Sequence, residues 1–130
     1  MRYFLIILCS VAVLIGIGYV VGGGSTKSVA PSAANVRMKN GTQMVEIRAK
    51  GGYNPRVSIA KAGVPTVLRF ITSGTFDCSA SIRIPSLGVS QILPQSGSTD
   101  VAIQNPAAGI LQGTCGMGMY PFSVQFTAQG

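Results

Sequence analysis

The regular spacing of short strand-like segments is the feature that most constrains the fold of this chain. Between Met44 and Lys50, apolar residues alternate with charged ones, which is typical of a strand with one buried face. Further segments rich in β-branched and apolar residues follow, separated by Gly and Pro. They are residues 57–59, 66–72, 81–84, 92–94, 99–103, 110–114 and 122–126. No helical period interrupts them, so the pattern predicts an all-β, antiparallel sandwich of seven to eight strands.

An uncharged apolar segment lies near the amino terminus. It runs from Tyr3 to Val21, which is long enough for one helix to cross a bilayer. Arg2 precedes it, and a positive flank is normally held inside, so the rest of the chain would face the periplasm or the extracellular space. We therefore expect residues 1–21 to be a single-pass signal anchor in the cell membrane. The alternative is a signal peptide cleaved at the small residues downstream, which would make the protein secreted.

A linker and one domain follow this segment. Residues 22–42 are rich in Gly, Ser, Ala and Pro and predict a flexible tether. Residues 43–130 suffice for a single domain with a modest core. The chain has 10 Lys and Arg against 3 Asp and Glu, but these basic residues are scattered and are not interleaved with aromatic ones. That distribution favours solvated strand faces over a nucleic-acid surface. The oligomeric state is left open.

The composition excludes most catalytic chemistry. The chain has no His, which excludes Ser-His and Cys-His nucleophile pairs, His-ligated zinc or haem, and the blue-copper site built on two imidazoles. Three acidic residues are too few for a two-carboxylate glycosidase or an oxygen cage for calcium. No general base or activated nucleophile is recognisable, so the sequence does not indicate an enzyme.

Sulfur-bearing side chains form the motif with the clearest chemistry. Cys115, Met117 and Met119 alternate with two glycines, which allow a tight loop in which the three sulfur atoms converge. Thiolate and thioether are soft ligands, and a set made only of sulfur selects Cu(I) over hard divalent ions. Cys78 would supply a fourth ligand if the fold brings its loop alongside.

Two structural interpretations compete with a metal site. Methionine is most often a core filler, although a core-filling pair flanked by glycine is unusual because glycine weakens the strand. The other is a disulfide between Cys78 and Cys115, since two thiols in an oxidising compartment tend to pair. In that case the domain would be a structural or surface-assembly module.

The order of these motifs resembles the small cupredoxin-like domains of exported bacterial and archaeal proteins, the group that includes the EfeO-type cupredoxin domain. Gly52-Tyr53-Asn54-Pro55 is similar to the Gly-Tyr-x-Pro segment of that group, and 115–120 is similar to its Cys-Gly-Met-Gly-Met-Tyr ligand loop. Cys78 stands where cupredoxins carry their first ligand. The resemblance implies a Greek-key β-sandwich with copper at one end, held by Cys78, Cys115, Met117 and Met119. No acidic residue comes directly after Cys78, so the group that would orient its sulfur is not identified.

The ligand set bears on mechanism. Without imidazole, Cu(II) loses the nitrogen donors that hold it, whereas thiolates and thioethers favour the monovalent ion. The expected function is therefore capture, buffering or handover of Cu(I) in copper transfer or tolerance, with a copper-donor or copper-acceptor protein as partner. The alternative copper-based function is that of a one-electron carrier, in which the bound copper cycles between Cu(I) and Cu(II).

Overall fold

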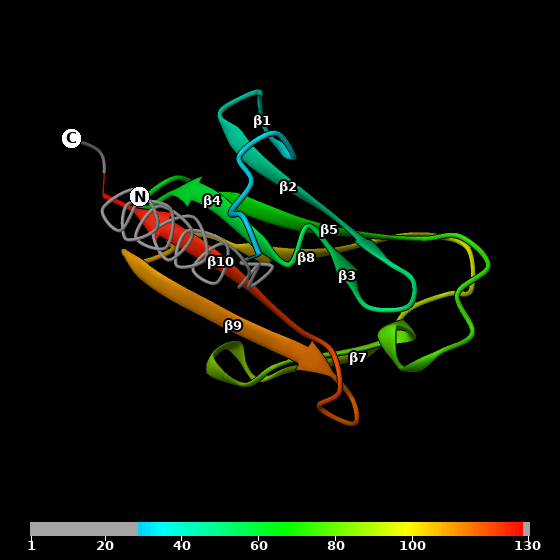
Figure 1. The fold of residues 1–130 in the computed structure, drawn as a ribbon. Helices are drawn as coiled ribbons and strands as arrows, with labels where there is room; N and C mark the ends of the chain where they lie inside the picture. Colours follow the sequence, from blue (N-terminus) through cyan, green and yellow to red (C-terminus); the bar gives the residue numbers. More distant parts are fainter. Residues whose placement is uncertain (1–28, 129–130) are drawn as a thin grey trace, which may run out of the picture.

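The structure, a computed structural model, describes residues 29–128. In this range the chain forms ten strands in two five-stranded sheets that pack face to face as a sandwich (Figure 1). The expected signal anchor or signal peptide, residues 1–21, lies outside the described residues. Within 29–128, the structure has no helix long and apolar enough to span a bilayer.

The chain crosses between the two sheets several times. One sheet has the order β1-β2-β5-β8, with β3 also paired to β2. It contains β1 (Val36–Lys39), β2 (Thr42–Ala49), β3 (Tyr53–Asn54), β5 (Thr66–Thr72) and β8 (Gly97–Ile103). The other sheet has the order β4-β10-β9-β6-β7. It contains β4 (Val57–Lys61), β6 (Ser81–Ile84), β7 (Val89–Ile92), β9 (Gly109–Cys115) and β10 (Pro121–Thr127). Two short 3₁₀ turns, η1 (Cys78–Ala80) and η2 (Pro85–Leu87), flank β6.

Period-two alternation places the apolar side chains between the sheets. In β2 every second side chain is buried, and its parallel neighbour β5 repeats the pattern, with Ile47 opposite Phe70. Three aromatic rings meet edge to face in the middle of this core: Tyr53 lies 4.7 Å from Phe122 between ring centroids, and Phe70 lies 5.4 Å from Phe122. Such contacts add to the stabilisation from burial alone.

The sheets are mixed, whereas the sequence pattern predicted an antiparallel sandwich. The pairs β2–β5 and β4–β10 are parallel. In the first pair the intervening strand β4 belongs to the other sheet, so the chain leaves the sheet and re-enters it in the same direction. Alternation indicates which face of a strand is buried, but it carries no information on the direction of the strand. The parallel pairs could therefore not be predicted from the sequence pattern.

The folded part begins earlier than residue 43. Strand β1 lies inside the segment expected to be a tether, and Asn40 and Gly41 form the tight turn that joins it to β2, both with positive φ (52° and 77°). An Asn-Gly pair is the preferred sequence for such a hairpin turn. Further upstream, the Ser32 N–H donates to the Val57 carbonyl (2.9 Å), so the chain is already pinned to β4 there.

A buried polar side chain joins the two sheets at the end where β2 begins. Gln43 is fully buried, and its Nε2 donates to the carbonyl of Lys61 in β4 (3.0 Å) and to Oγ1 of Thr66 in β5 (3.0 Å). Its Oε1 accepts from the Lys61 N–H (2.9 Å). The side-chain amide of Gln43 therefore satisfies both main-chain groups of Lys61 in β4 from the opposite sheet.

Candidate metal centre

The two cysteines of the domain lie together at the end of the sandwich where β9 ends. Cys78 begins η1, immediately before β6, and Cys115 is the last residue of β9. Strands β6 and β9 are antiparallel neighbours with Ile82 opposite Cys115. This register brings the cysteines to a Cα–Cα distance of 5.8 Å, where they form a disulfide, although they are 37 residues apart in sequence. The pairing is the one considered above as the alternative to a metal site.

The two methionines project from the same end of the molecule. Met117 and Met119 lie on the loop between β9 and β10, and their side chains are 80% and 63% exposed. The loop is closed beneath them because the Cys115 N–H donates to the Tyr120 carbonyl (3.0 Å) and the Gly118 N–H donates to the Cys115 carbonyl (2.9 Å). Neither methionine is a core filler. The structure thus joins the two cysteines and leaves the two thioethers facing solvent on the loop that Cys115 begins.

The two cysteines differ in their access to solvent. Cys115 is fully buried within the hydrophobic core, whereas Cys78 is only partly buried against it. A molecule that approaches this end of the sandwich therefore meets the thioethers first, then Cys78, and Cys115 last.

The loop that carries Cys78 is organised by the acidic residue before it. Asp77 is the N-cap of η1: its Oδ1 accepts from the Ser79 N–H (3.1 Å) and from the Ser79 hydroxyl. Its Oδ2 accepts from the N–H of Gly51 (2.5 Å). These hydrogen bonds, above all the one from the Ser79 hydroxyl, lower the pKa of the Asp77 carboxyl below its usual value. Sequence reasoning missed this residue, although Asp two positions before a Ser is a capping signal.

The Gly-Tyr-x-Pro segment supports both loops from the other sheet. The Tyr53 hydroxyl lies 3.3 Å from the carbonyl of Ser79, within η1, and 3.3 Å from that of Ser81, the first residue of β6, and shares its proton between them. Burial, with a smaller contribution from the charge of Asp77, raises the pKa of the Tyr53 phenol above its usual value. A Cβ atom on Gly52 would lie 3.6 Å from the ring of Tyr120. The segment therefore also lies against the last residue of the loop between β9 and β10 (116–120), the methionine loop.

The available donors define what this end of the molecule can bind. Among the described residues, no group of three or more His, Cys, Asp and Glu side chains is placed to hold a metal ion. A site here must therefore combine the two cysteine sulfurs with thioethers. The disulfide supplies no thiolate, whereas the reduced pair supplies two. Two thiolates beside two thioethers suit a soft monovalent ion and do not suit Mg²⁺ or Ca²⁺, which prefer oxygen ligands. Thiolates also bind Zn²⁺, but structural zinc sites take their remaining ligands from Cys, His or carboxylates and not from thioethers.

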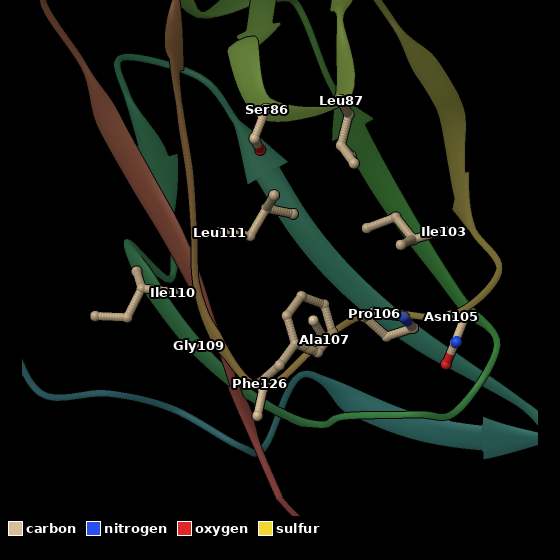
Figure 2. Close-up of a pocket in the computed structure, with 11 residues that line it drawn as sticks. Ser86, Leu87, Ile103, Asn105, Pro106, Ala107, Gly109, Ile110, Leu111 and Phe126 are labelled. Carbon is tan, nitrogen blue, oxygen red and sulfur yellow. The ribbon is translucent and has the colours of Figure 1, made fainter.

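An apolar pocket lies where β9 begins, at the opposite end of that strand from Cys115. Figure 2 shows the side chains that line it. Its volume is about 280 Å³, and the side chains of Leu87, Ile103, Leu111 and Phe126 line it. Ser86 and Asn105 are the polar side chains in its lining, which contains no titratable group. The pocket therefore offers neither a metal ligand nor an acid or base.

The family model that matches this chain and the solved structures similar to it agree with one another. A family model described as a cupredoxin-like domain matches residues 20–128. The metal-binding domain of the Cu(I)-exporting P-type ATPase CopA of Streptococcus pneumoniae D39, crystallised with Cu(I), is 20% identical, with a TM-score of 0.67 over 79% of this chain and 99% of that domain. A copper-binding protein solved by NMR in its apo form is 26% identical, with a TM-score of 0.67 over 78% of this chain and 100% of its own. Auracyanin B is 16% identical, with a TM-score of 0.52 over 77% and 99%. Among curated proteins, none matches significantly.

Proposed function

This chain belongs to the cupredoxin-like family, and from that premise we propose that it binds one soft metal ion, Cu(I), through Cys78, Cys115, Met117 and Met119. In this proposal the protein buffers copper, transfers it or confers tolerance to it. Its apolar segment 1–21 tethers it to the membrane, with the domain on the outer side.

The observation that carries the proposal is the pairing of two cysteines beside two exposed methionines. Cys78 and Cys115 come from distant parts of the chain and meet at one end of the sandwich, and the thioethers lie on the loop that Cys115 begins. Core packing does not account for side chains of Met that are mostly exposed. The copper named for the CopA domain and for the NMR protein supports the choice of metal.

Copper enters the reduced form of the site. Reduction of the disulfide by a dithiol adds two electrons and two protons to the cysteine pair and oxidises the dithiol to its own disulfide. Cu(I) then displaces the two thiol protons. The exposed thioethers of Met117 and Met119 meet a donor first and are released first to an acceptor, and the buried Cys115 is released last. Handover therefore proceeds by stepwise exchange of ligands with a copper-donor or copper-acceptor protein.

The test is a titration of the reduced full-length protein with Cu(I) against a competing chelator. We expect a tight one-to-one complex that Cys115→Ser abolishes. The double variant Met117→Leu, Met119→Leu should weaken it by at least about tenfold, which is about 1.4 kcal/mol. Met38→Leu is the matched control because Met38 is also exposed but lies on β1. A one-to-one complex that none of these changes affects would overturn the ligand assignment.

The disulfide itself favours a second candidate function. If the bond between Cys78 and Cys115 is permanent, the domain is a structural or surface-assembly module closed by that bridge. A separate preparation, purified without oxygen and without added reductant, separates the two functions when the thiols of Cys78 and Cys115 are counted. Two reactive thiols in the domain favour the metal site, and none favours the bridge.

A further inference from the structure

The loop that carries Cys78 has little apolar packing to hold it. Thr75 fixes the start of the loop through its hydroxyl, which donates to the Ala49 carbonyl (2.6 Å). Phe76, the next residue, is 77% exposed and does not anchor the backbone. The 3₁₀ turn that begins at Cys78 has only three residues. Between Thr75 and that turn, a polar interaction has to set the position of the backbone.

The Asp77 carboxylate provides this interaction with both of its oxygen atoms. Oδ1 binds the N–H and the hydroxyl of Ser79, which is fully buried, and Oδ2 binds the N–H of Gly51. Gly51 lies in the turn between β2 and β3 and has a positive φ of 58°. The carboxylate therefore ties the residues on both sides of Cys78 to a turn of the opposite sheet. Hydrogen bonds to an ionised acceptor are stronger than those between neutral groups.

We propose that Asp77 is a positioning residue that holds the Cys78 sulfur at the place where it meets Cys115. Without the bond to Gly51, the backbone before Cys78 loses its tie to the opposite sheet, and only the residues after Cys78 stay held there, through the Tyr53 hydroxyl. Cys78 is then held less firmly, and the two sulfurs are less often within reach of each other. The effect on copper rests on the function proposed above, whereas the effect on the meeting of the two thiols does not.

The variant Asp77→Asn isolates the link to the opposite sheet. Asn is as good an N-cap as Asp, so its single amide oxygen still accepts from Ser79. Its NH₂ group faces the Gly51 N–H as a second donor, so that hydrogen bond is lost. Asp100→Asn is the matched control. It removes the same charge from an exposed carboxylate that pairs with Arg69 on the outer face of the sheet containing β8.

The first measurement needs no metal. Full-length protein is equilibrated in glutathione redox buffers, and the oxidised fraction gives the effective concentration of one thiol at the other. We expect Asp77→Asn to lower this value by about tenfold, the factor that one lost hydrogen bond to a charged group supports. Asp100→Asn should leave it unchanged. If the two variants give the same value while circular dichroism shows both folded, the proposal is wrong.

The second measurement is the Cu(I) titration with the reduced proteins. Asp77→Asn should bind Cu(I) about tenfold more weakly than the wild type, and Asp100→Asn should bind as the wild type does. A wild type that does not bind Cu(I) overturns the proposed function, and the redox equilibrium still decides the role of Asp77. If Asp77→Asn does not fold, Ser79→Ala removes the hydroxyl bond alone and should shift the equilibrium in the same direction by a smaller factor. An unchanged value for Ser79→Ala would then count against the role.

Discussion

At the scale of single residues, Gly113 is required for the aromatic core. It is buried in β9 directly opposite Phe122, and a Cβ atom there would lie 2.1 Å from Cζ of Phe122. Gly113→Ala forces this ring out of its edge-to-face contacts with Tyr53 and Phe70, so we expect a loss of about 2–3 kcal/mol in the free energy of unfolding. Urea unfolding measures it. Combining Gly113→Ala with Phe122→Leu should cost less than the sum of the two single changes, and strict additivity would contradict the explanation.

The residues of the candidate site were partly predictable from the sequence. The run from Cys115 to Met119 is recognisable in the sequence as a candidate soft-metal site, because soft ligands alternate with glycine. Asp77 was missed for a physical reason: its partner Gly51 lies 26 residues away, on a turn of the other sheet. Local sequence shows that Asp77 is able to cap a turn, but it does not show which distant N–H the second oxygen meets.

At the scale of elements, Gln43 connects strands of the two sheets. Gln43→Leu fills a similar volume but leaves the Lys61 N–H and carbonyl of β4 without their partners. We expect it to lower the free energy of unfolding by about 1–3 kcal/mol, because the main-chain groups of Lys61 that it leaves unpaired are partly buried. Gln112→Leu, at an exposed position of β9, is the control and should change stability little. Equal effects of the two changes in urea unfolding would show that the hydrogen bonds are not the cause.

The elements that the sequence pattern misses are those whose pattern is weak. Strand β1 has no buried side chain, and β3 has two residues, so neither shows the alternation that marks a half-buried strand. Strand β7 covers Val89–Ile92 and not 92–94, because Val89 pairs with Ile84 across the η2 turn. Strand β5 has the bounds expected from the sequence, and β2 begins two residues earlier and ends one residue earlier than the alternation from Met44 to Lys50 indicated, since burial of one face specifies their pattern.

At the scale of the whole molecule, the bond between Cys78 and Cys115 closes a loop of 37 residues. A loop of that length restricts the unfolded chain enough to stabilise the fold by about 4 kcal/mol. The oxidised protein should therefore unfold at a higher temperature than the reduced one, and Cu(I) should restore part of the loss by binding only the folded state. Thermal unfolding with and without a reductant measures both effects. The variant Cys78→Ser, Cys115→Ser should respond to neither reagent, and equal midpoints for oxidised and reduced wild type would contradict the expectation.

The hydrogen bonds that close the methionine loop bear on which of its residues can be substituted without disturbing the fold. Tyr120 and Cys115 are joined by a main-chain hydrogen bond below the loop, and the Gly116 N–H donates to the Ser81 carbonyl in the neighbouring strand. Residues 117–119 form the tip of the loop. They carry both thioethers and belong to neither β9 nor β10. At the proposed metal site, an exchange confined to residues 117–119 would change the thioether ligands and leave the scaffold beneath the loop as it is. If the proposed site is right, substitutions at only two positions, Met117 and Met119, are enough to change the thioether ligands without changing the sandwich.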